Sequence, residues 1–295
     1  MRAKLIIGAM FFLWSSRLFG ADYIFQPLAV PEARYTQPMG INDLGDVVGV
    51  YADCEFCQVQ AFLFSDGQYY DIGVEGASRV TPFGINKHGV IAGTLVNAGQ
   101  FAFIMDDDKT TVLDKAVRAD GINNNHNPVV VGYQSTAKFN QAAYLWQAGR
   151  YVPLVNPDLP GILGSAATGV NDRGDIVGYY FFDNGPCCTI SQGFVIKSGK
   201  LSHIELIPLG INSDGVIVGL AGAGNDGAVL ENGVVTLIKY PGSSYTQVHG
   251  INNKGVIVGY HQTDGRMVGF IATPFAAMNA NGKKKATDLM AQGRK

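Results

Sequence analysis

One short pattern, Gly-Ile-Asn or Gly-Val-Asn followed by a turn and a valine-rich strand, occurs six times in this chain of 295 residues. The first copy reads GINDLGDVVG from Gly40, and the last reads GINNKGVIVG from Gly250. The six copies are marked by their asparagines: Asn42, Asn86, Asn123, Asn171, Asn212 and Asn252. Their spacing of 37 to 48 residues is typical of propeller blades, in which each repeat contributes several strands.

Each repeat can be divided into four strands. The first ends in Gly-Ile-Asn, and an Asn-x-x-Gly turn follows, because Asn favours the first turn position and Gly tolerates the last. A second strand such as VVG comes next, then a variable loop, a third strand such as QAFLF, a short turn and a fourth strand such as YYDIG. Hydrophobic alternation in these strands is imperfect, which favours sheets covered on both faces.

The last repeat lacks a fourth strand after GFIATP, but an equivalent segment occurs at the other end of the chain. The segment YIFQPLAVPEA at Tyr23–Ala33 is similar to QYYDIGVEGA at Gln68–Ala77, a fourth strand with its exit loop. The sequence therefore predicts an all-β, six-bladed β-propeller with four antiparallel strands per blade, closed by the N-terminal strand completing the last blade. The alternatives are a sandwich or an open solenoid, and a solenoid would need capping repeats at both ends.

Two stretches carry a resemblance to a known family. GINNKGVIVGY followed by GFIAT, and GINDLGDVVGVY followed by QAFLFSDGQYYDI, resemble the bacterial HAF-family extracellular repeat over about residues 23–273. The resemblance implies a secreted or surface β-propeller of uncharacterised activity, and it supplies no catalytic residues. The third repeat departs from the pattern, because NNNHNPVVVG replaces the turn glycine, so we expect an irregular turn there.

The two ends of the chain differ from the repeats. Arg2 and Lys4 precede an apolar run, Leu5–Trp14, that is too short to span a bilayer. We expect a signal peptide at residues 1–21, with an uncleaved anchor as the alternative, a six-repeat β-propeller at 22–273 and a disordered basic tail at 274–295. The expected location is therefore secreted, extracellular or periplasmic, with no stable membrane insertion after signal cleavage.

Charge narrows the range of partners. Residues 22–272 hold 14 basic and 23 acidic residues, a net charge of −9. This argues against nucleic-acid binding, which needs basic surface to neutralise phosphates. The sequence contains no Walker loop, Gly-x-Ser-x-Gly or His-Glu-x-x-His motif, so we expect no cofactor and no metal, and we expect a monomer.

The loops after the second and fourth strands vary in length, and in a four-stranded blade they share one face of the propeller. Variable loops on a uniform scaffold are typical of binding surfaces. Aromatic residues beside carboxylates suit sugar recognition, and separated carboxylates suit glycoside hydrolysis. The candidate ligand-binding residues on this face are Tyr51, Tyr133, Tyr179, Tyr180, Tyr260, Asp53, Asp158 and Asp183, with Glu55, Asp226 and Asp264 as further acidic residues.

This face indicates a binding module for an extracellular glycan or protein rather than an enzyme. The alternatives are a polysaccharide hydrolase or lyase on a propeller scaffold, for which no catalytic residue can be assigned, and a purely structural surface or matrix protein. Among the five histidines, which show no metal spacing, only His249 immediately precedes a Gly-Ile-Asn and could approach the central channel.

The four cysteines lie in two of the variable loops, in the first and fourth repeats. An even number of cysteines in an exported chain favours disulfides. Bridging opposite repeats would need Cα atoms within about 7 Å, so the local pairs Cys54–Cys57 and Cys187–Cys188 are favoured. A zinc site that uses all four cysteines is the alternative, although adjacent cysteines make poor joint ligands.

Overall fold

The computed structural model describes residues 14–16, 23–54, 57–137, 141–154, 161–183, 189–222 and 226–275. Every secondary-structure element delimited within these ranges is a β-strand, so the all-β prediction is confirmed. The described residues contain no helix that is long and apolar enough to cross a membrane.

Four repeats form separate antiparallel sheets of four strands each. The second repeat contains β7 (Arg79–Ile85), β8 (Ile91–Val96), β9 (Gln100–Asp106) and β10 (Lys109–Leu113). The third contains β11 (Arg118–Ile122), β12 (Val130–Gln134), β13 (Ala142–Gln147) and β14 (Arg150–Pro153). The fourth contains β15 (Ile162–Val170), β16 (Ile176–Asp183), β17 (Thr189–Lys197) and β18 (Lys200–Ile204). The fifth contains β19 (Ile207–Ile211), β20 (Ile217–Ala221), β21 (Asp226–Glu231) and β22 (Val234–Leu237).

The remaining strands form a single nine-stranded sheet. The first repeat supplies β3 (Tyr35–Ile41), β4 (Val47–Ala52), β5 (Gln60–Ser65) and β6 (Gln68–Ile72). The last repeat supplies β23 (Thr246–Ile251), β24 (Ile257–Thr263) and β25 (Arg266–Pro274), and the N-terminal part supplies β1 (Trp14–Ser16) and β2 (Tyr23–Leu28). The expected pairing of the N-terminal strand with the last repeat is present, because β2 pairs antiparallel with β25 from Tyr23↔Pro274 to Leu28↔Gly269.

The prediction of a six-bladed propeller is wrong, because the described chain contains four separate four-stranded blades rather than six. The first and last repeats are joined by a parallel pairing of β25 with β3, at Met267↔Tyr35. The backbone amide of Met267 donates to the carbonyl of Arg34 at 3.2 Å. The Nε2 amide of Gln37 lies 2.9 Å from the sulfur of Met267. The strand pairing and the Met267–Arg34 bond connect the first and last repeats through their backbones, and the Gln37–Met267 contact adds a side-chain link.

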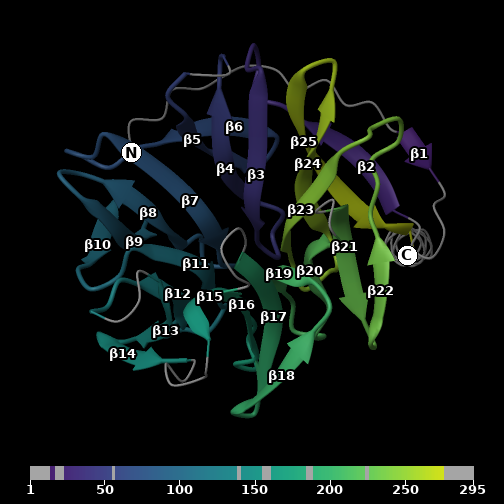
Figure 1. The fold of residues 1–295 in the computed structure, drawn as a ribbon. Coiled ribbons are helices and arrows are strands. Elements are labelled where there is room, and N and C mark those ends of the chain that lie inside the picture. Colours follow the sequence, from purple (N-terminus) through teal and green to yellow (C-terminus); the bar gives the residue numbers. More distant parts are fainter. Residues whose placement is uncertain are drawn as a thin grey trace, which may run out of the picture.

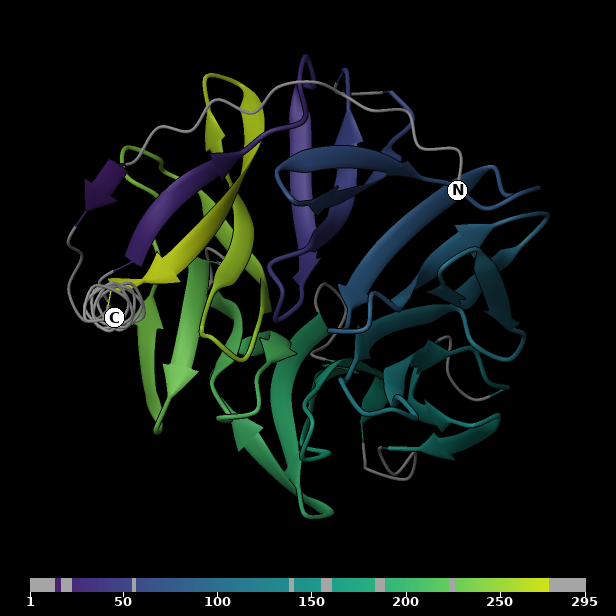
Figure 2. The same ribbon diagram turned by 180° about the vertical axis from the view of Figure 1, so that it is seen from behind.

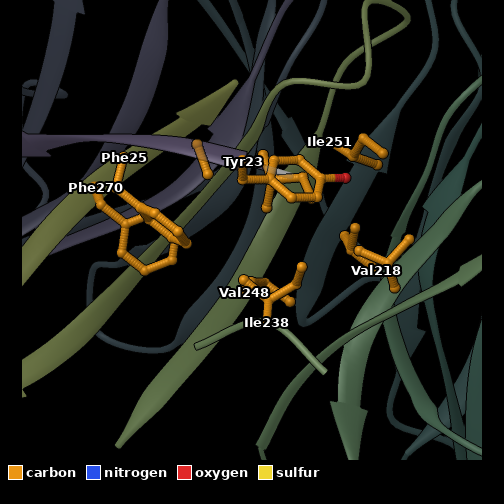
Figure 3. Packing of buried hydrophobic residues seen from close by; sticks show 10 residues of the cluster. Tyr23, Phe25, Val218, Ile238, Val248, Ile251 and Phe270 are labelled. Carbon is orange, nitrogen blue, oxygen red and sulfur yellow. The ribbon is translucent and has the colours of Figure 1, made fainter. Parts of the chain in front are cut away.

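The sheets are arranged around a central axis as in a β-propeller, with the first strand of each repeat innermost (Figure 1). Seen from behind, the purple strand β2 lies beside the yellow strand β25, which brings the two ends of the repeat region together (Figure 2). Hydrophobic clusters fill the spaces between neighbouring repeats. One of them joins Phe25 of β2 to Val218, Val248 and Phe270 from the fifth and last repeats (Figure 3).

Glycine in the second strand of each repeat is explained by a close backbone approach. Each innermost strand has a register shift against its neighbour, as between Pro208 and Gly210 in β19. The shift pushes a carbonyl of the innermost strand against the second strand. A Cβ added to Gly219 would lie 2.1 Å from the carbonyl oxygen of Ile207. Only glycine fits there without a backbone movement, which explains its occurrence at this point of the pattern.

The asparagine of the pattern connects each repeat to the next. The Nδ2 of Asn86 donates to the carbonyl of Asn123 at 3.1 Å, and its Oδ1 accepts the amides of His88 and Val90 at 3.0 Å. The same donation to the next repeat occurs at all six asparagines, and Asn252 closes the ring by donating to the carbonyl of Asn42 at 2.9 Å. The six repeats are therefore bound into a closed ring of hydrogen bonds at one end of the channel.

The residues that follow these asparagines make hydrogen bonds across the same end of the channel. The Nδ2 of Asn253 donates to both Asp43, at 2.9 Å, and Asp172, at 3.1 Å. The Nδ2 of Asn124 donates to the same two carboxylates, at 3.3 and 3.1 Å. We call Asp43, Asn124, Asp172 and Asn253 the polar plug. Because its bonds join the first, third, fourth and last repeats, this end of the channel is narrow and closed by side chains.

The third repeat has the irregular turn that its sequence predicts. Its turn is closed by the amide of Asn123 and the carbonyl of Val129, whereas the first repeat uses Asn42 and Asp46. The expected signal peptide at residues 1–21 lies outside the described residues except for β1, which pairs with β2. The expected basic tail lies outside them as well, apart from Pro274, which ends β25, and Phe275.

Candidate functional site at the mouth of the channel

A β-bulge in each innermost strand turns one side chain toward the channel. In every repeat the register skips the residue before the Gly of Gly-Ile-Asn. Bulges re-aim side chains in this way and are common beside active sites. The skipped residues all line a channel cavity of about 70 Å³, and they are Met39, Phe83, Asp120, Thr168, Leu209 and His249.

Asp120 is the charged member of this set. Its carboxylate Oδ1 accepts from Nε of Arg118 at 2.7 Å and lies 2.6 Å from Nη2 of the same residue. Its Oδ2 is buried and has no hydrogen-bond partner among the described residues. Burial raises the pKa of Asp120, and the Arg118 guanidinium opposes that rise. The channel therefore holds a carboxylate with one oxygen paired and the other buried without a partner among the described residues.

His249 occupies the equivalent position in the last repeat, three repeats away around the ring. Its Nε2 is inaccessible to solvent and has no partner among the described residues. Burial lowers the pKa of His249 to about 4, and the positive charge of Arg118 lowers it further in the same direction. The imidazole is therefore neutral at physiological pH. Its ring lies 5.5 Å from the ring of Tyr260, centre to centre.

Three of the predicted tyrosines gather around Arg118 and His249. They are Tyr133, Tyr179 and Tyr260, and each follows the glycine of the second strand in its repeat. Tyr133 pairs in register with Arg118 itself. Burial raises the pKa of Tyr179, and the charge of Asp120 raises it further while Arg118 opposes this. The Tyr260 hydroxyl lies 2.6 Å from Oε1 of Gln247, and burial followed by the neighbouring Tyr245 raises its pKa.

Arg118 connects these groups to the neighbouring second repeat. Its guanidinium carbon lies 3.9 Å from the centre of the Phe83 ring, a cation–π contact. Burial lowers its pKa, but Asp120 chiefly, and then Tyr133 and Tyr179, raise it above its ordinary value. About a third of the side chain remains exposed at 34%. Arg118 is thus a fixed cation beside aromatic rings, and solvent can still reach its side chain. We call Arg118, Asp120, Tyr133, Tyr179, His249 and Tyr260 the mouth cluster.

The other two predicted tyrosines lie elsewhere. Tyr51 is 7% exposed, its hydroxyl lies 2.9 Å from both Gln60 and Asp71, and it borders a separate cavity beside the Cys54–Cys57 loop. Tyr180 is 1% exposed, stacks on Phe194 and hydrogen-bonds His203. Both follow the glycine by two positions, and the period of a strand therefore turns them away from the channel.

The predicted acidic residues do not meet in the mouth cluster. Asp53 is exposed in its loop, Asp183 is exposed at the end of β16, and Asp158 and Glu55 lie outside the described residues. Cys54 and Cys57 form the predicted local disulfide. This pairing removes two of the thiolates that the alternative zinc site requires. Cys187 and Cys188 lie outside the described residues. Within the described part of the chain, no three His, Cys, Asp or Glu side chains are grouped closely enough to hold a metal ion.

Sequence reasoning missed Arg118 and Asp120, although it noted His249. A usable signal exists at the position before the Gly of Gly-Ile-Asn. Three repeats place an apolar residue there, one places threonine, and the other two place Asp120 and His249. A charged side chain at a position that the repeat assigns to the channel is costly unless it is paired or functional. This departure from the repeat, rather than the loop lengths, marks the candidate site.

The cluster combines a paired cation and carboxylate, a neutral imidazole and three tyrosines, and of these Asp120 and His249 line the channel cavity. Tyrosine rings offer apolar faces for stacking together with hydroxyl groups for hydrogen bonds. The two unpartnered atoms, Oδ2 of Asp120 and Nε2 of His249, leave hydrogen-bonding capacity for a ligand or water. Chemically, this arrangement can bind a polar molecule that has an apolar face.

No protein-family model matches the sequence, and no curated protein matches it. Among solved structures, the chain is similar to a gluconolactonase from Xanthomonas campestris, with a TM-score of 0.50, 11% identity, and coverage of 93% of this chain and 98% of that one. It also matches the β-propeller domain of the Trilobed protease from Pyrococcus furiosus, with a TM-score of 0.49, 11% identity and coverage of 92% of each chain. A virginiamycin B lyase from Staphylococcus aureus matches with a TM-score of 0.46, 14% identity, and coverage of 85% of this chain and 99% of that one. At these identities the likeness concerns the fold alone: the chain is a β-propeller.

Proposed function

We propose that this protein is a secreted β-propeller binding module that recognises an extracellular glycan at the mouth cluster. The observation that carries the proposal is the grouping of Tyr133, Tyr179 and Tyr260 around Arg118, Asp120 and His249. Sugar rings present an apolar face edged by hydroxyl groups, and aromatic rings beside hydrogen-bonding groups match both features.

The proposed location rests on separate observations. The N-terminal pattern of basic residues and a short apolar run fits an export signal. A Cys54–Cys57 disulfide fits an oxidising compartment outside the cytoplasm. The resemblance to the HAF-family extracellular repeat agrees with both, and membership of that family is part of the proposal. The acidic charge of residues 22–272 favours a partner other than nucleic acid.

A glycan array probed with the purified protein tests the proposal. We expect binding to a defined set of glycans and a loss of at least tenfold in affinity for the Tyr179→Ala variant, because the variant removes a stacking face. Tyr70→Ala is the matched control, since Tyr70 lies on β6, the outermost strand of its repeat, and should leave affinity unchanged. Absence of glycan binding, or equal loss in both variants, would contradict a glycan site at the mouth.

A second candidate is a polysaccharide hydrolase or lyase that uses the same cluster. It is favoured by the presence of two buried titratable groups with altered pKa, Asp120 and His249, in one cavity. Prolonged incubation with the glycans that bind, followed by measurement of reducing ends and of unsaturated products, separates the two functions. Turnover that Asp120→Asn abolishes would establish the enzyme in place of the binding module.

A further inference from the structure

We infer that the ligand is recognised by its chain end, with one hydroxyl of the terminal sugar entering the channel between Asp120 and His249. The inference rests on the proposed glycan-binding function and adds the part of the glycan that is read. It follows from the shape of the channel, the two unpartnered atoms and the charge balance of the cluster.

The channel is blind and narrow. Its far end is closed by the asparagine ring and by the polar plug, whose hydrogen bonds cross the axis. The cavity of about 70 Å³ is far below the roughly 300–1,000 Å³ of pockets that enclose whole ligands, yet it exceeds the roughly 10–15 Å³ that one water needs. A single substituent of a sugar can enter it, whereas the ring must stay outside among the tyrosines. A glycan cannot pass through, which favours a sugar at the end of the chain as the one that inserts a substituent.

The two unpartnered atoms define the hydrogen bonds that the inserted substituent has to make. Oδ2 of Asp120 is an acceptor when the carboxylate is ionised, and Nε2 of a neutral imidazole can donate or accept. They belong to the third and last repeats, which are opposite members of a ring of six. A hydroxyl group can donate to the carboxylate and accept from the imidazole at once. Such a group satisfies both atoms, each of which is costly to leave buried without a partner.

Charge favours a neutral group over an ion. The positive charge of Arg118 is balanced by Asp120, with which it forms a close ion pair. His249 is neutral because burial lowers its pKa to about 4. An ammonium group entering the cavity would lie near Arg118, and a carboxylate or phosphate would lie near Asp120. A sugar hydroxyl avoids both repulsions while using the same hydrogen bonds.

The first arm of the experiment uses the glycan array itself. If the chain end is read, glycans that bind should share a terminal residue, and extension of that residue by one further sugar should abolish binding. Hits that share only an internal motif, whatever their terminal residue, would overturn the inference and leave the proposed function standing. An array without hits would overturn the proposed function, and the inference with it.

The second arm uses the methyl glycoside of the shared terminal sugar and its monodeoxy analogues, with affinity measured by calorimetry. For the original protein we expect one deoxy analogue to bind at least tenfold more weakly than the parent. That analogue lacks the hydroxyl that enters the channel, so Asp120 and His249 are left without a partner. In His249→Phe and in Asp120→Asn the difference between the parent and that analogue should shrink, because each variant alters one of the two partners of the hydroxyl. Asp120→Asn keeps a side-chain oxygen that can accept from Arg118. If Asp120→Asn does not fold, His249→Phe is an independent test of the same hydroxyl.

Matched controls lie at the opposite end of the channel. His88→Phe and Asp214→Asn change exposed residues on the asparagine side, and both should preserve the preference for the parent over the deoxy analogue. If all deoxy analogues bind like the parent, or if His249→Phe and Asp120→Asn keep the full preference, the hydroxyl does not enter the channel. Retained binding that remains sensitive to Tyr179→Ala would then still support the glycan site at the mouth.

Discussion

The two ends of the central channel are built from the same repeat but differ in how completely their polar groups are paired. At the closed end, six asparagines each bind their own turn and the next repeat, and the polar plug binds across the axis. At the mouth, the six bulge residues are chemically unlike one another, and two of them keep buried atoms without partners among the described residues.

This difference separates scaffold from site. Identical residues in every repeat serve a task that every repeat shares, which here is joining neighbours and permitting close backbone contacts. A residue that breaks the repeat at a buried position serves the whole molecule once. The comparison predicts that changes at the closed end alter stability alone, whereas changes at the mouth alter stability, its pH dependence and ligand binding.

The largest effect is expected from Arg118→Met at the mouth. Asp120 would lose its ion-pair partner while 91% buried, and removal of one partner of a buried ion pair costs about 3–5 kcal/mol of unfolding free energy. Because burial then holds the folded-state pKa of Asp120 above the unfolded value, the unfolded state releases its proton first and stability falls as pH rises. Urea unfolding of the variant should therefore give higher stability at pH 5 than at pH 7.

The double variant Arg118→Met/Asp120→Leu is the control for this prediction. It removes both charges, and it should recover most of the loss and have little pH dependence between pH 5 and 7. A double variant as unstable as the single one would show that Arg118 stabilises the fold through its contact with Phe83 instead of through Asp120.

The next effect concerns the scaffold, at Gly219→Ala. The added Cβ would lie 2.1 Å from the carbonyl oxygen of Ile207 and 2.8 Å from the Cα of Pro208, so the backbone must move. We expect a loss of about 3 kcal/mol in the free energy of unfolding, at the upper end of the range for overpacking. Gly73→Ala is the matched control, because nothing lies within 4 Å of its Cβ position. Equal stabilities of the two variants would contradict the close-approach explanation.

A smaller effect is expected at the asparagine ring. Asn86→Ala removes a donor to the Asn123 carbonyl and the acceptor for two backbone amides, in a residue that is 1% exposed. Leaving such groups unpaired should cost about 2 kcal/mol of unfolding free energy. Asn97→Ala, at an exposed loop position, should change stability by less than about 0.5 kcal/mol. Ligand binding should remain unchanged in both variants, and a loss confined to Asn86→Ala would show that the two ends are coupled.

Much of the fold could be predicted from the repeat, because the period, the turn glycines and the missing fourth strand are all visible in the sequence. The pairing of β2 with β25 followed from the likeness of Tyr23–Ala33 to Gln68–Ala77. The single nine-stranded sheet could not be predicted. It depends on one parallel pairing, Met267↔Tyr35, and on a contact between Gln37 and Met267 that no repeat pattern encodes.

The site was only partly predictable for a similar reason. Strand period alone separates Tyr179, which approaches Arg118, from the adjacent Tyr180, which is 1% exposed. The bulge that turns Asp120 into the channel is a three-dimensional feature that its sequence position does not reveal. Loop variability directed attention to the loops, whereas the residues that depart most from the repeat lie on the innermost strands.

The smallest effect tests whether His249 is held neutral at the mouth. Its folded-state pKa of about 4 lies below the ordinary value of 6.5, so the unfolded state binds more protons between these values and stability falls as pH drops through that range. Between pH 7 and 5.5 the loss of unfolding free energy from this residue should be about 1 kcal/mol.

His261, whose pKa burial also lowers to about 4, should contribute similarly, so His249→Phe should remove about half of the pH dependence in this range. His88→Phe, which changes an exposed histidine outside the mouth cluster, is the comparison variant. If His249→Phe leaves the pH dependence unchanged, the imidazole is accessible enough to protonate freely, and the mouth would then carry a positive charge that suits an acidic sugar better than a neutral one.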